Sequence, residues 1–156
     1  MDDDRRTPRS SAIEMNELVL PQHTNNHGTV FGGVVMSWID ICASMAAQRH
    51  SRSAVVTASM DRLDFLAPIQ IGYLVNLEAM VNYVGRSSME IGVRVEAEEP
   101  RSGERVHAAS AYLTFVALDD DGKPRGVPTL ELETDGDRRR FEEAQIRREK
   151  RMRRTP

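Results

Sequence analysis

One stretch of the chain, Phe31 to Ala47, holds a single charged side chain among residues that are otherwise apolar, small or neutral polar. That charged residue is Asp40. The stretch lacks proline and contains several alanines and methionines, so we expect a helix from Gly33 to about Arg49. A helix that is apolar on nearly every side must be enclosed by other structure. In a single domain, a sheet curled around the helix is the economical enclosure.

Asp40 needs an explanation in such surroundings. A carboxylate that is buried, dry and unpaired costs several kcal/mol. The chain must therefore give it water and hydrogen bonds, or use its perturbed proton affinity. Directly upstream lies HTNNHGTVFGG, residues 23–33, a polar loop that runs into paired glycines. We interpret the polar loop, the glycines and the lone acid together as a functional site.

Much of the remaining sequence follows the two-residue period of strands. Apolar side chains occupy the odd positions of residues 73–83 and of residues 88–98, which predicts one wet face for each strand. Glycine-containing turns at 85–87 and 100–103 indicate antiparallel neighbours. The last strand is apolar on both faces, as a central strand would be. We expect strands within residues 12–20, 54–65, 73–83, 88–98 and 106–118, and thus an α+β domain with an antiparallel sheet.

The expected domain covers residues 12–131. Residues 1–11 are polar and predict a disordered or weakly ordered tail. Residues 132–156 form a charged segment, in which Lys and Arg outnumber the acids over 135–154. That segment fits either an exposed helix with charge pairs four residues apart or a disordered tail.

Composition excludes several classes of protein. The 156 residues include one cysteine, Cys42, so no internal disulfide can form, which fits a reducing compartment. The start shows no apolar signal region, and no run reaches about 18 apolar residues. We therefore expect a cytoplasmic protein without membrane insertion. The net charge of −3 gives no reason to expect nucleic acid binding.

We assign no catalytic role to the cysteine or the histidines from the sequence. We expect Cys42 to be a small buried hydrophobe, because no cationic neighbour in sequence would lower its pKa. The four histidines show no metal-ligand spacing, so we expect no metal site.

Four segments together resemble the hotdog-fold acyl-CoA thioester hydrolases, and among them the cytosolic and bacterial long-chain acyl-CoA hydrolase class. They occur in the family's order over roughly residues 13–131. The segments are HTNNHGTVFGGVVMSWIDICASMAAQRH, VVTASMDRLDFLAPIQIGYLVNLEAMV, GRSSMEIGVRVEAE and AASAYLTFVALDDDGKPRGVPTL. The resemblance implies a hotdog fold, an antiparallel sheet wrapped around a long central helix. It does not extend to the basic C-terminal segment, and many relatives have an acid where this chain has His23.

The resemblance also implies an activity in fatty acid metabolism, the hydrolysis of fatty acyl-CoA to free fatty acid and CoA. Coenzyme A is then part of the substrate, and no cofactor is needed. Family members pair a loop asparagine with a helix aspartate fifteen residues later, and Asn25 and Asp40 have that spacing. The asparagine comes from one subunit and the aspartate from the other. Such proteins form dimers, often assembled as trimers of dimers, which makes a hexamer. Ser87 and Ser88 fall where relatives hold the pantetheine and phosphates of CoA.

Thioester hydrolysis needs an activated water, donors for the developing oxyanion and a place for the leaving thiolate. Asp40 could act as general base, helped by a pKa raised through partial burial, or could attack the carbonyl itself to give a mixed anhydride. Backbone N–H groups near Gly32 and Gly33 would stabilise the oxyanion at the helix start. Asn25 could orient the water. Arg86, with the two serines that follow it, could hold phosphate.

Two other functions remain open from sequence. A hotdog enoyl-thioester hydratase would use a histidine with a helix acid, and no histidine lies within the expected helix. A non-catalytic acyl-CoA binding or sensor protein would need a DNA-binding domain to act as a regulator. The segments flanking the expected fold are too short to form such a domain with its own core.

Overall fold

A computed structural model describes residues 4–154 of the chain. Its elements, in chain order, are β1 (Arg5–Arg6), α1 (Pro8–Ser11), β2 (Ile13–Leu18), the 3-10 helix η1 (Pro21–His23), α2 (Gly32–Ser51), β3 (Ala54–Phe65), β4 (Leu74–Val84), β5 (Ser88–Glu98), β6 (Arg105–Leu118), β7 (Thr129–Leu130) and α3 (Asp135–Arg154).

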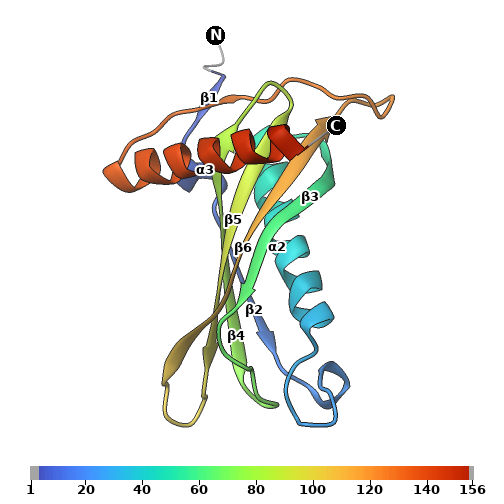
Figure 1. Ribbon diagram of the computed structural model, residues 1–156, viewed down its shortest axis with the longest axis vertical. Coiled ribbons are helices and arrows are strands. Elements are labelled where there is room, and N and C mark those ends of the chain that lie inside the picture. The colour runs from blue at the N-terminus through green and yellow to red at the C-terminus, as the bar shows by residue number, and fades with distance from the viewer. Residues whose placement is uncertain (1–3, 155–156) are drawn as a thin grey trace.

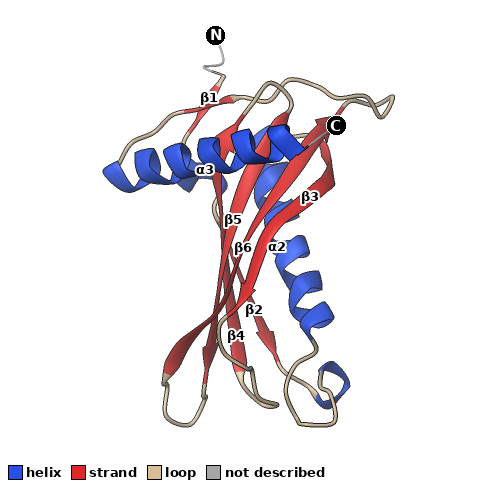
Figure 2. Cartoon of the chain, in the orientation of Figure 1, coloured by secondary structure: helices blue, strands red, loops and turns tan. Residues whose placement is uncertain are grey.

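Five strands form an antiparallel sheet in the order β2-β4-β5-β6-β3. The long helix α2 packs along one face of this sheet, and α3 crosses the other face near one end (Figure 1). Strands and helices segregate into layers, with the sheet in the middle (Figure 2). This is the hotdog arrangement expected from the sequence.

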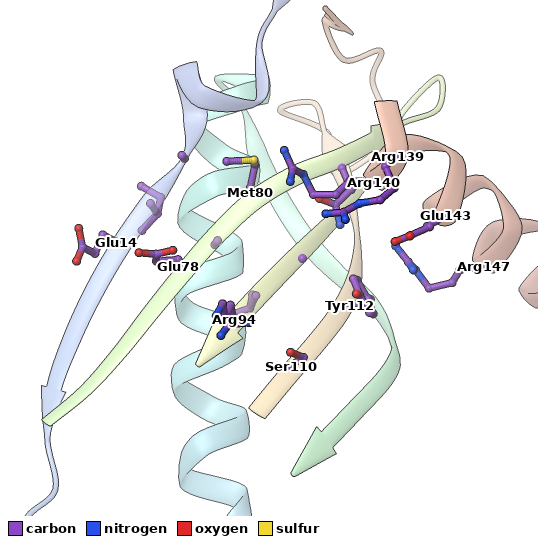
Figure 3. Close-up of a pocket in the computed structure, with 16 residues that line it drawn as sticks. Glu14, Glu78, Met80, Arg94, Ser110, Tyr112, Arg139, Arg140, Glu143 and Arg147 are labelled. Atoms are coloured by element: carbon purple, nitrogen blue, oxygen red, sulfur yellow. The ribbon is translucent and has the colours of Figure 1, made fainter. Parts of the chain in front are cut away.

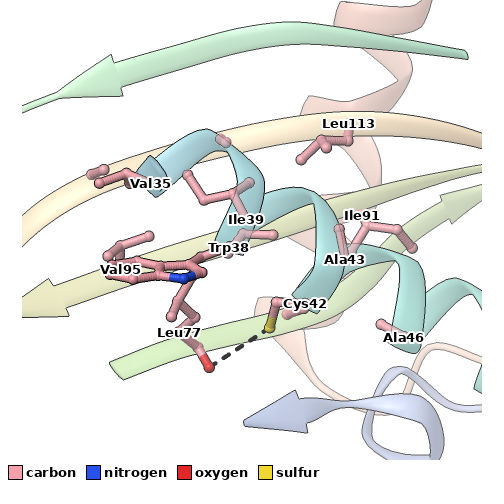
Figure 4. Close-up of a cluster of buried hydrophobic side chains, with 14 of the residues drawn as sticks. Val35, Trp38, Ile39, Cys42, Ala43, Ala46, Leu77, Ile91, Val95 and Leu113 are labelled. Carbon is pink, nitrogen blue, oxygen red and sulfur yellow. Dashed lines mark hydrogen bonds between the residues drawn. The ribbon is translucent and has the colours of Figure 1, made fainter. Parts of the chain in front are cut away.

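The core lies between α2 and the inner face of the sheet (Figure 4). The odd-numbered side chains of β4, such as Leu77, point into it, as the two-residue period predicted. Ile39 and Cys42 of α2 are fully buried against them. Trp38 fills the space beside these residues and is 7% exposed. Burial of this apolar area is the main favourable contribution to folding.

The outer face of the sheet differs from expectation. It was predicted to be wet along residues 73–83 and 88–98, yet Asn82 and Glu90 are only 3% and 4% exposed. The reason is α3, which covers these side chains. The segment that carries α3 was left open between an exposed helix and a disordered tail, and in the structure residues 135–154 are helical and packed.

The expectation that the sheet encloses α2 on all sides is wrong for a single chain. Phe31, Met36 and Ile41 are 50%, 41% and 48% exposed. The sheet covers one side of the helix, and the opposite side remains open. The helix also runs slightly longer than expected, to Ser51, and ends where Arg52 adopts a left-handed conformation with φ of 53°.

The N-terminal segment also differs from the expected tail. Residues 5–6 form β1, which pairs in parallel with β7, and residues 8–11 form α1. Residues 1–3 lie outside the described part of the chain, as do residues 155 and 156. Within residues 4–154, no helix combines the length and apolar character needed to cross a membrane.

Candidate active site

Asp40 lies halfway along α2 and is partly buried. Its Oδ1 accepts a hydrogen bond of 2.8 Å from the hydroxyl of Thr57 on β3. Across residues 4–154 its second carboxylate oxygen, Oδ2, has no hydrogen-bond partner. The helix and the edge strand therefore fix the carboxylate through one oxygen and leave the other available to a water molecule or a substrate.

Thr57 was not singled out from the sequence. Threonine is common in strands, so its presence in a strand carries no functional signal. The contact with Asp40 also joins different elements, and no local spacing rule predicts it. Only the packing of α2 on the sheet shows that the two residues meet.

Asn25 belongs to the polar loop before α2, and its side chain organises that loop. The side-chain carbonyl accepts from the backbone N–H groups of His27 at 2.9 Å and Thr29 at 3.3 Å. The amide nitrogen donates to the Thr29 hydroxyl at 2.9 Å. This is an Asx-type turn. No contact joins Asn25 to Asp40 within the described part of one chain, so a single chain does not bring the expected pair together.

The start of α2 presents backbone donors. The helix begins at Gly32, and Phe31 before it supplies no side-chain cap. Val34 and Val35 donate their N–H groups to the carbonyl of Phe31. The N–H groups of Gly32 and Gly33 have no acceptor among the described residues, and both glycines are exposed. Together with the helix dipole, these donors favour an anionic oxygen at this end.

A cavity of about 400 Å³ adjoins these donors. Its lining is mainly apolar and includes Val30, Val35, Phe65 and Leu66. A Cβ at Gly32 would lie 3.4 Å from the Cζ atom of Phe65, so the glycine allows close approach between the helix start and this ring. The apolar lining suits contact with an apolar chain.

Arg86 and Ser87 lie in the turn of the hairpin between β4 and β5, and Ser88 is the first residue of β5. The serine carbonyls accept from the backbone, Ser87 from Ala117 at 2.9 Å and Ser88 from Gly85 at 2.8 Å. The Arg86 side chain is exposed. The hairpin lies at the end of the sheet where α2 ends, away from the start of α2 (Figure 1). One chain therefore does not gather these residues around Asp40.

A second cavity, of about 620 Å³, lies between α3 and the outer face of the sheet (Figure 3). Arg139, Arg140 and Glu143 reach it from α3, and Glu14 and Glu78 from strands β2 and β4. Its charges are of both signs. It opens on the face of the sheet opposite Asp40, so it does not belong to the candidate site.

Cys42 is excluded as a nucleophile. It is fully buried, and its sulfur lies 3.8 Å from the carbonyl oxygen of Leu77 (Figure 4). Burial, with a smaller contribution from the charge of Glu78, raises the pKa of the thiol to about 11. The thiol therefore stays protonated at neutral pH, which confirms the sequence interpretation.

The chain is similar in sequence to known proteins. The sequence pattern of the thioesterase superfamily matches residues 27–104. An uncharacterized acyl-CoA thioester hydrolase of Bacillus subtilis, YkhA, is 50% identical over 127 residues, which cover 81% of this chain and 74% of that protein.

The chain is also similar to solved structures, in both sequence and fold. An acyl-CoA hydrolase from Staphylococcus aureus, in complex with butyryl coenzyme A, coenzyme A and coenzyme A disulfide, is 42% identical with a TM-score of 0.90. The alignment covers 96% of this chain and 92% of that one. An apo-hexameric acyl-CoA thioesterase is 41% identical with a TM-score of 0.93, and the alignment covers 96% of both chains.

Variants of the Staphylococcus aureus enzyme have also been solved. In separate structures, alanine replaces an asparagine, an aspartate or a threonine. These three positions are spaced along that chain as Asn25, Asp40 and Thr57 are along this one.

Proposed function

The chain belongs to the thioesterase superfamily, and we propose that it is an acyl-CoA thioester hydrolase, which converts fatty acyl-CoA and water to a free fatty acid and coenzyme A. The observation that carries this proposal is the pairing of Asp40 with Thr57. It provides a fixed carboxylate with one unoccupied oxygen on a partly buried helix. Such a group can remove a proton from water beside a thioester.

In the proposed reaction Asp40 is the general base. Thr57 holds one carboxylate oxygen, and the other accepts the proton of the attacking water. Asn25 of the partner subunit orients this water or the thioester carbonyl. A partner is part of this proposal because Asn25 and Asp40 make no contact with each other within the described part of one chain. The hydrogen bonds of the Asx-type turn around Asn25 hold that loop in a defined conformation, which favours catalysis by positioning.

Gly32 and Gly33 supply the oxyanion donors in this proposal. Their N–H groups have no acceptor in the described chain, and they lie at the positive end of the α2 dipole. A donor of this kind contributes about 2.7–4 kcal/mol to transition-state stabilisation in measured enzymes. The apolar cavity beside Phe65 is then placed to take the acyl chain.

The coenzyme A part of the substrate contacts Arg86, Ser87 and Ser88 in the same proposal. Arg86 is exposed and can pair with a phosphate. The two serines add hydroxyl donors. This hairpin is remote from the start of α2 (Figure 1), and we propose that the substrate meets the two regions on different subunits.

We further propose a homodimer as the functional unit, assembled as a trimer of dimers. The hexameric state named for a similar structure supports this. The reaction uses water and protein groups, so we propose that no metal or other cofactor takes part. A cytoplasmic location fits the unpaired Cys42, which suits a reducing compartment.

The proposal is tested by steady-state hydrolysis of palmitoyl-CoA. Asp40→Asn keeps the shape of the side chain but removes the base, and Asn25→Ala removes the amide. We expect each to lower kcat by at least about 100-fold, as for loss of a catalytic acid–base group. Asp120→Asn, in an exposed loop, serves as the matched control and should keep wild-type activity. Losses below about tenfold for both site variants would rule out this mechanism.

A further inference from the structure

We infer that Arg151 of α3 is a positioning residue for hydrolysis: through Asp61 it fixes the irregular part of β3 that aims Thr57 at Asp40. This inference rests on the proposed function of the Asp40–Thr57 pair. By this inference α3, which lies on the face of the sheet opposite Asp40, contributes to the reaction.

The aim of Thr57 depends on an irregularity in β3. Thr57 pairs with Phe115, whose side chain lies in the core, but Ser59 pairs with Thr114, whose side chain faces α3. In a regular strand, residues two apart point to the same face. The extra residue, Ala58, shifts this alternation by one. Thr57 therefore faces α2 only because the strand bulges at Ala58.

A second irregularity follows three residues later, where Asp61 is the extra residue. Met60 pairs with Leu113 and Arg62 with Tyr112, which leaves Asp61 without a register partner. β3 is also an edge strand of the described sheet, with β6 as its one neighbour. Backbone pairing alone therefore specifies this segment weakly, and side chains must hold it.

The side-chain contacts that hold this part of β3 centre on Asp61. Its carboxylate accepts from the Ser59 hydroxyl at 3.0 Å, from the Thr114 hydroxyl at 3.1 Å and from Nη1 of Arg151 at 2.8 Å. The same Arg151 nitrogen lies 2.9 Å from the Thr114 hydroxyl. The Asp61 side chain is 14% exposed and that of Arg151 is 27% exposed. Loss of Arg151 would leave a largely buried carboxylate without its cation.

The helix that carries Arg151 is itself firmly attached. Arg147, one turn earlier, binds Glu90 through two hydrogen bonds of 2.7 and 3.0 Å, and its guanidinium lies 3.6 Å from the ring centre of Tyr112. Arg147 and Tyr112 approach each other from α3 and β6 (Figure 3). These contacts hold α3, and with it Arg151, in place on the sheet. Arg151 then fixes Asp61, and Asp61 fixes the bulged part of β3 that positions Thr57.

The test compares Arg151→Met with Arg153→Met in the full-length protein. Methionine keeps the apolar stem and removes the charge. Arg153 is exposed on the same helix, and none of the described residues forms an ion pair with it. With palmitoyl-CoA we expect Arg151→Met to lower kcat about tenfold with KM changed less than about twofold, because misplaced catalytic groups lower the rate of the chemical step. Arg153→Met should behave as wild type.

The decisive comparison repeats Arg151→Met in a Thr57→Ala background. If Arg151 acts through Thr57, the added change should lower kcat less than about twofold there. Arg151→Lys, which keeps the cation, should recover most of the lost rate. A full tenfold loss in the Thr57→Ala background, or wild-type kcat for a folded Arg151→Met protein, would overturn the inference.

Asp61→Asn provides a second variant in case Arg151→Met does not fold. It keeps the side-chain shape and removes the charge that Arg151 neutralises, and the same pattern of kcat loss and non-additivity is expected. Failure of the proposed function would look different. In that case the wild type would not hydrolyse acyl-CoA, or Asp40→Asn would retain activity, whatever the behaviour of Arg151.

Discussion

The two oxygens of Asp40 have separate environments, and the proposed reaction depends on this division. One oxygen is held by the Thr57 hydroxyl at 2.8 Å. A carboxylate held at one point keeps its direction while the other oxygen exchanges a proton. A freely rotating carboxylate would spend much of its time misaligned with the water.

Replacing Thr57 by valine should therefore impair catalysis more than stability. Valine keeps the branched shape but loses the donor, and a hydrogen bond to a charged group contributes about 1.5–3 kcal/mol. We expect kcat to fall about 10- to 100-fold, while Thr57→Ser, which keeps the hydroxyl, stays within about threefold of wild type. Steady-state kinetics with parallel thermal melts separate the two effects. Equal activity of the valine and serine variants would show that the hydroxyl has no role.

His50 gives a prediction for stability against pH. It is fully buried at the end of α2, with Nε2 2.9 Å from the carbonyl oxygen of Pro128. Burial is the main cause that lowers its pKa below the ordinary value of 6.5, and the positive charge of Arg6 adds to it. The unfolded chain then binds a proton that the folded protein excludes. The free energy of unfolding should fall as the pH drops below about 6.5, by at most about 1.4 kcal/mol per pH unit.

The measurement is urea unfolding across the range in which histidine titrates, from about pH 8 down to about pH 5. His50→Gln, which can still donate to Pro128, should flatten the slope over the part of this range below the ordinary histidine pKa. His27→Gln, at an exposed loop position, should keep the wild-type slope. An unchanged slope in His50→Gln would show that this histidine does not set the acid sensitivity.

The residues of the proposed site could be named from the sequence to different degrees. Asp40 stood out because a lone charge in an apolar segment is a local property of the sequence. Asn25 could be named only through the family resemblance, since asparagine is common in loops. Thr57 was missed because its importance arises from a contact between α2 and β3, and from a bulge that sets which face it occupies. Neither is encoded in the local pattern.

At the scale of elements, the strands were the most predictable part. The expected strands 54–65 and 88–98 agree with the bounds of β3 and β5. For β5 the reason is the alternation along a strand with one buried face, which is a direct consequence of the pleat. The position of α3 was not predictable. Its charged residues suit a solvated helix as well as one packed on the sheet. The partners that hold it are also distant in sequence: Arg147 binds Glu90, 57 residues away, and Arg151 binds Asp61, 90 residues away.

The Arg147–Glu90 pair should be a main attachment of α3. Their side chains are 19% and 5% exposed, so removal of the arginine leaves a buried carboxylate unpaired. We expect Arg147→Met to lower the free energy of unfolding by about 3–5 kcal/mol, and an added Glu90→Gln to restore part of it. Urea titration measures both. Arg148→Met is the control, because Arg148 lies a more distant 5.6 Å from the Tyr83 ring centre and should contribute at most about 1 kcal/mol. Equal losses for the two arginines would contradict this assignment.

For the whole molecule, the open side of α2 is where we expect the interface of the proposed dimer. Met36 and Ile41 expose apolar surface on the helix that carries Asp40, and Phe31 does so directly before it. An apolar surface of this kind beside a functional residue is typical of a subunit interface. It also places the expected interface where a second chain could bring its Asn25 loop to Asp40.

A charge placed on this surface should break the assembly and the activity together. We expect Ile41→Asp to lower the mass found by light scattering toward that of a monomer, with loss of hydrolysis, because an unpaired carboxylate would be buried at the interface. Ile146→Asp is a matched control, since Ile146 is similarly exposed at 53% but lies on α3. An Ile41→Asp protein that stays assembled and active would exclude this surface as the interface.

In the proposed mechanism, one site combines Asp40 of one subunit with Asn25 of the other. It is tested by mixing two inactive proteins, Asp40→Asn and Asn25→Ala, after reversible dissociation or by co-expression. A mixed dimer contains one site with both residues intact and one with neither. Random pairing should therefore restore about a quarter of wild-type activity, as expected for two equivalent sites in a two-fold dimer. No recovery in a mixture shown by mass spectrometry to contain mixed dimers would contradict the account.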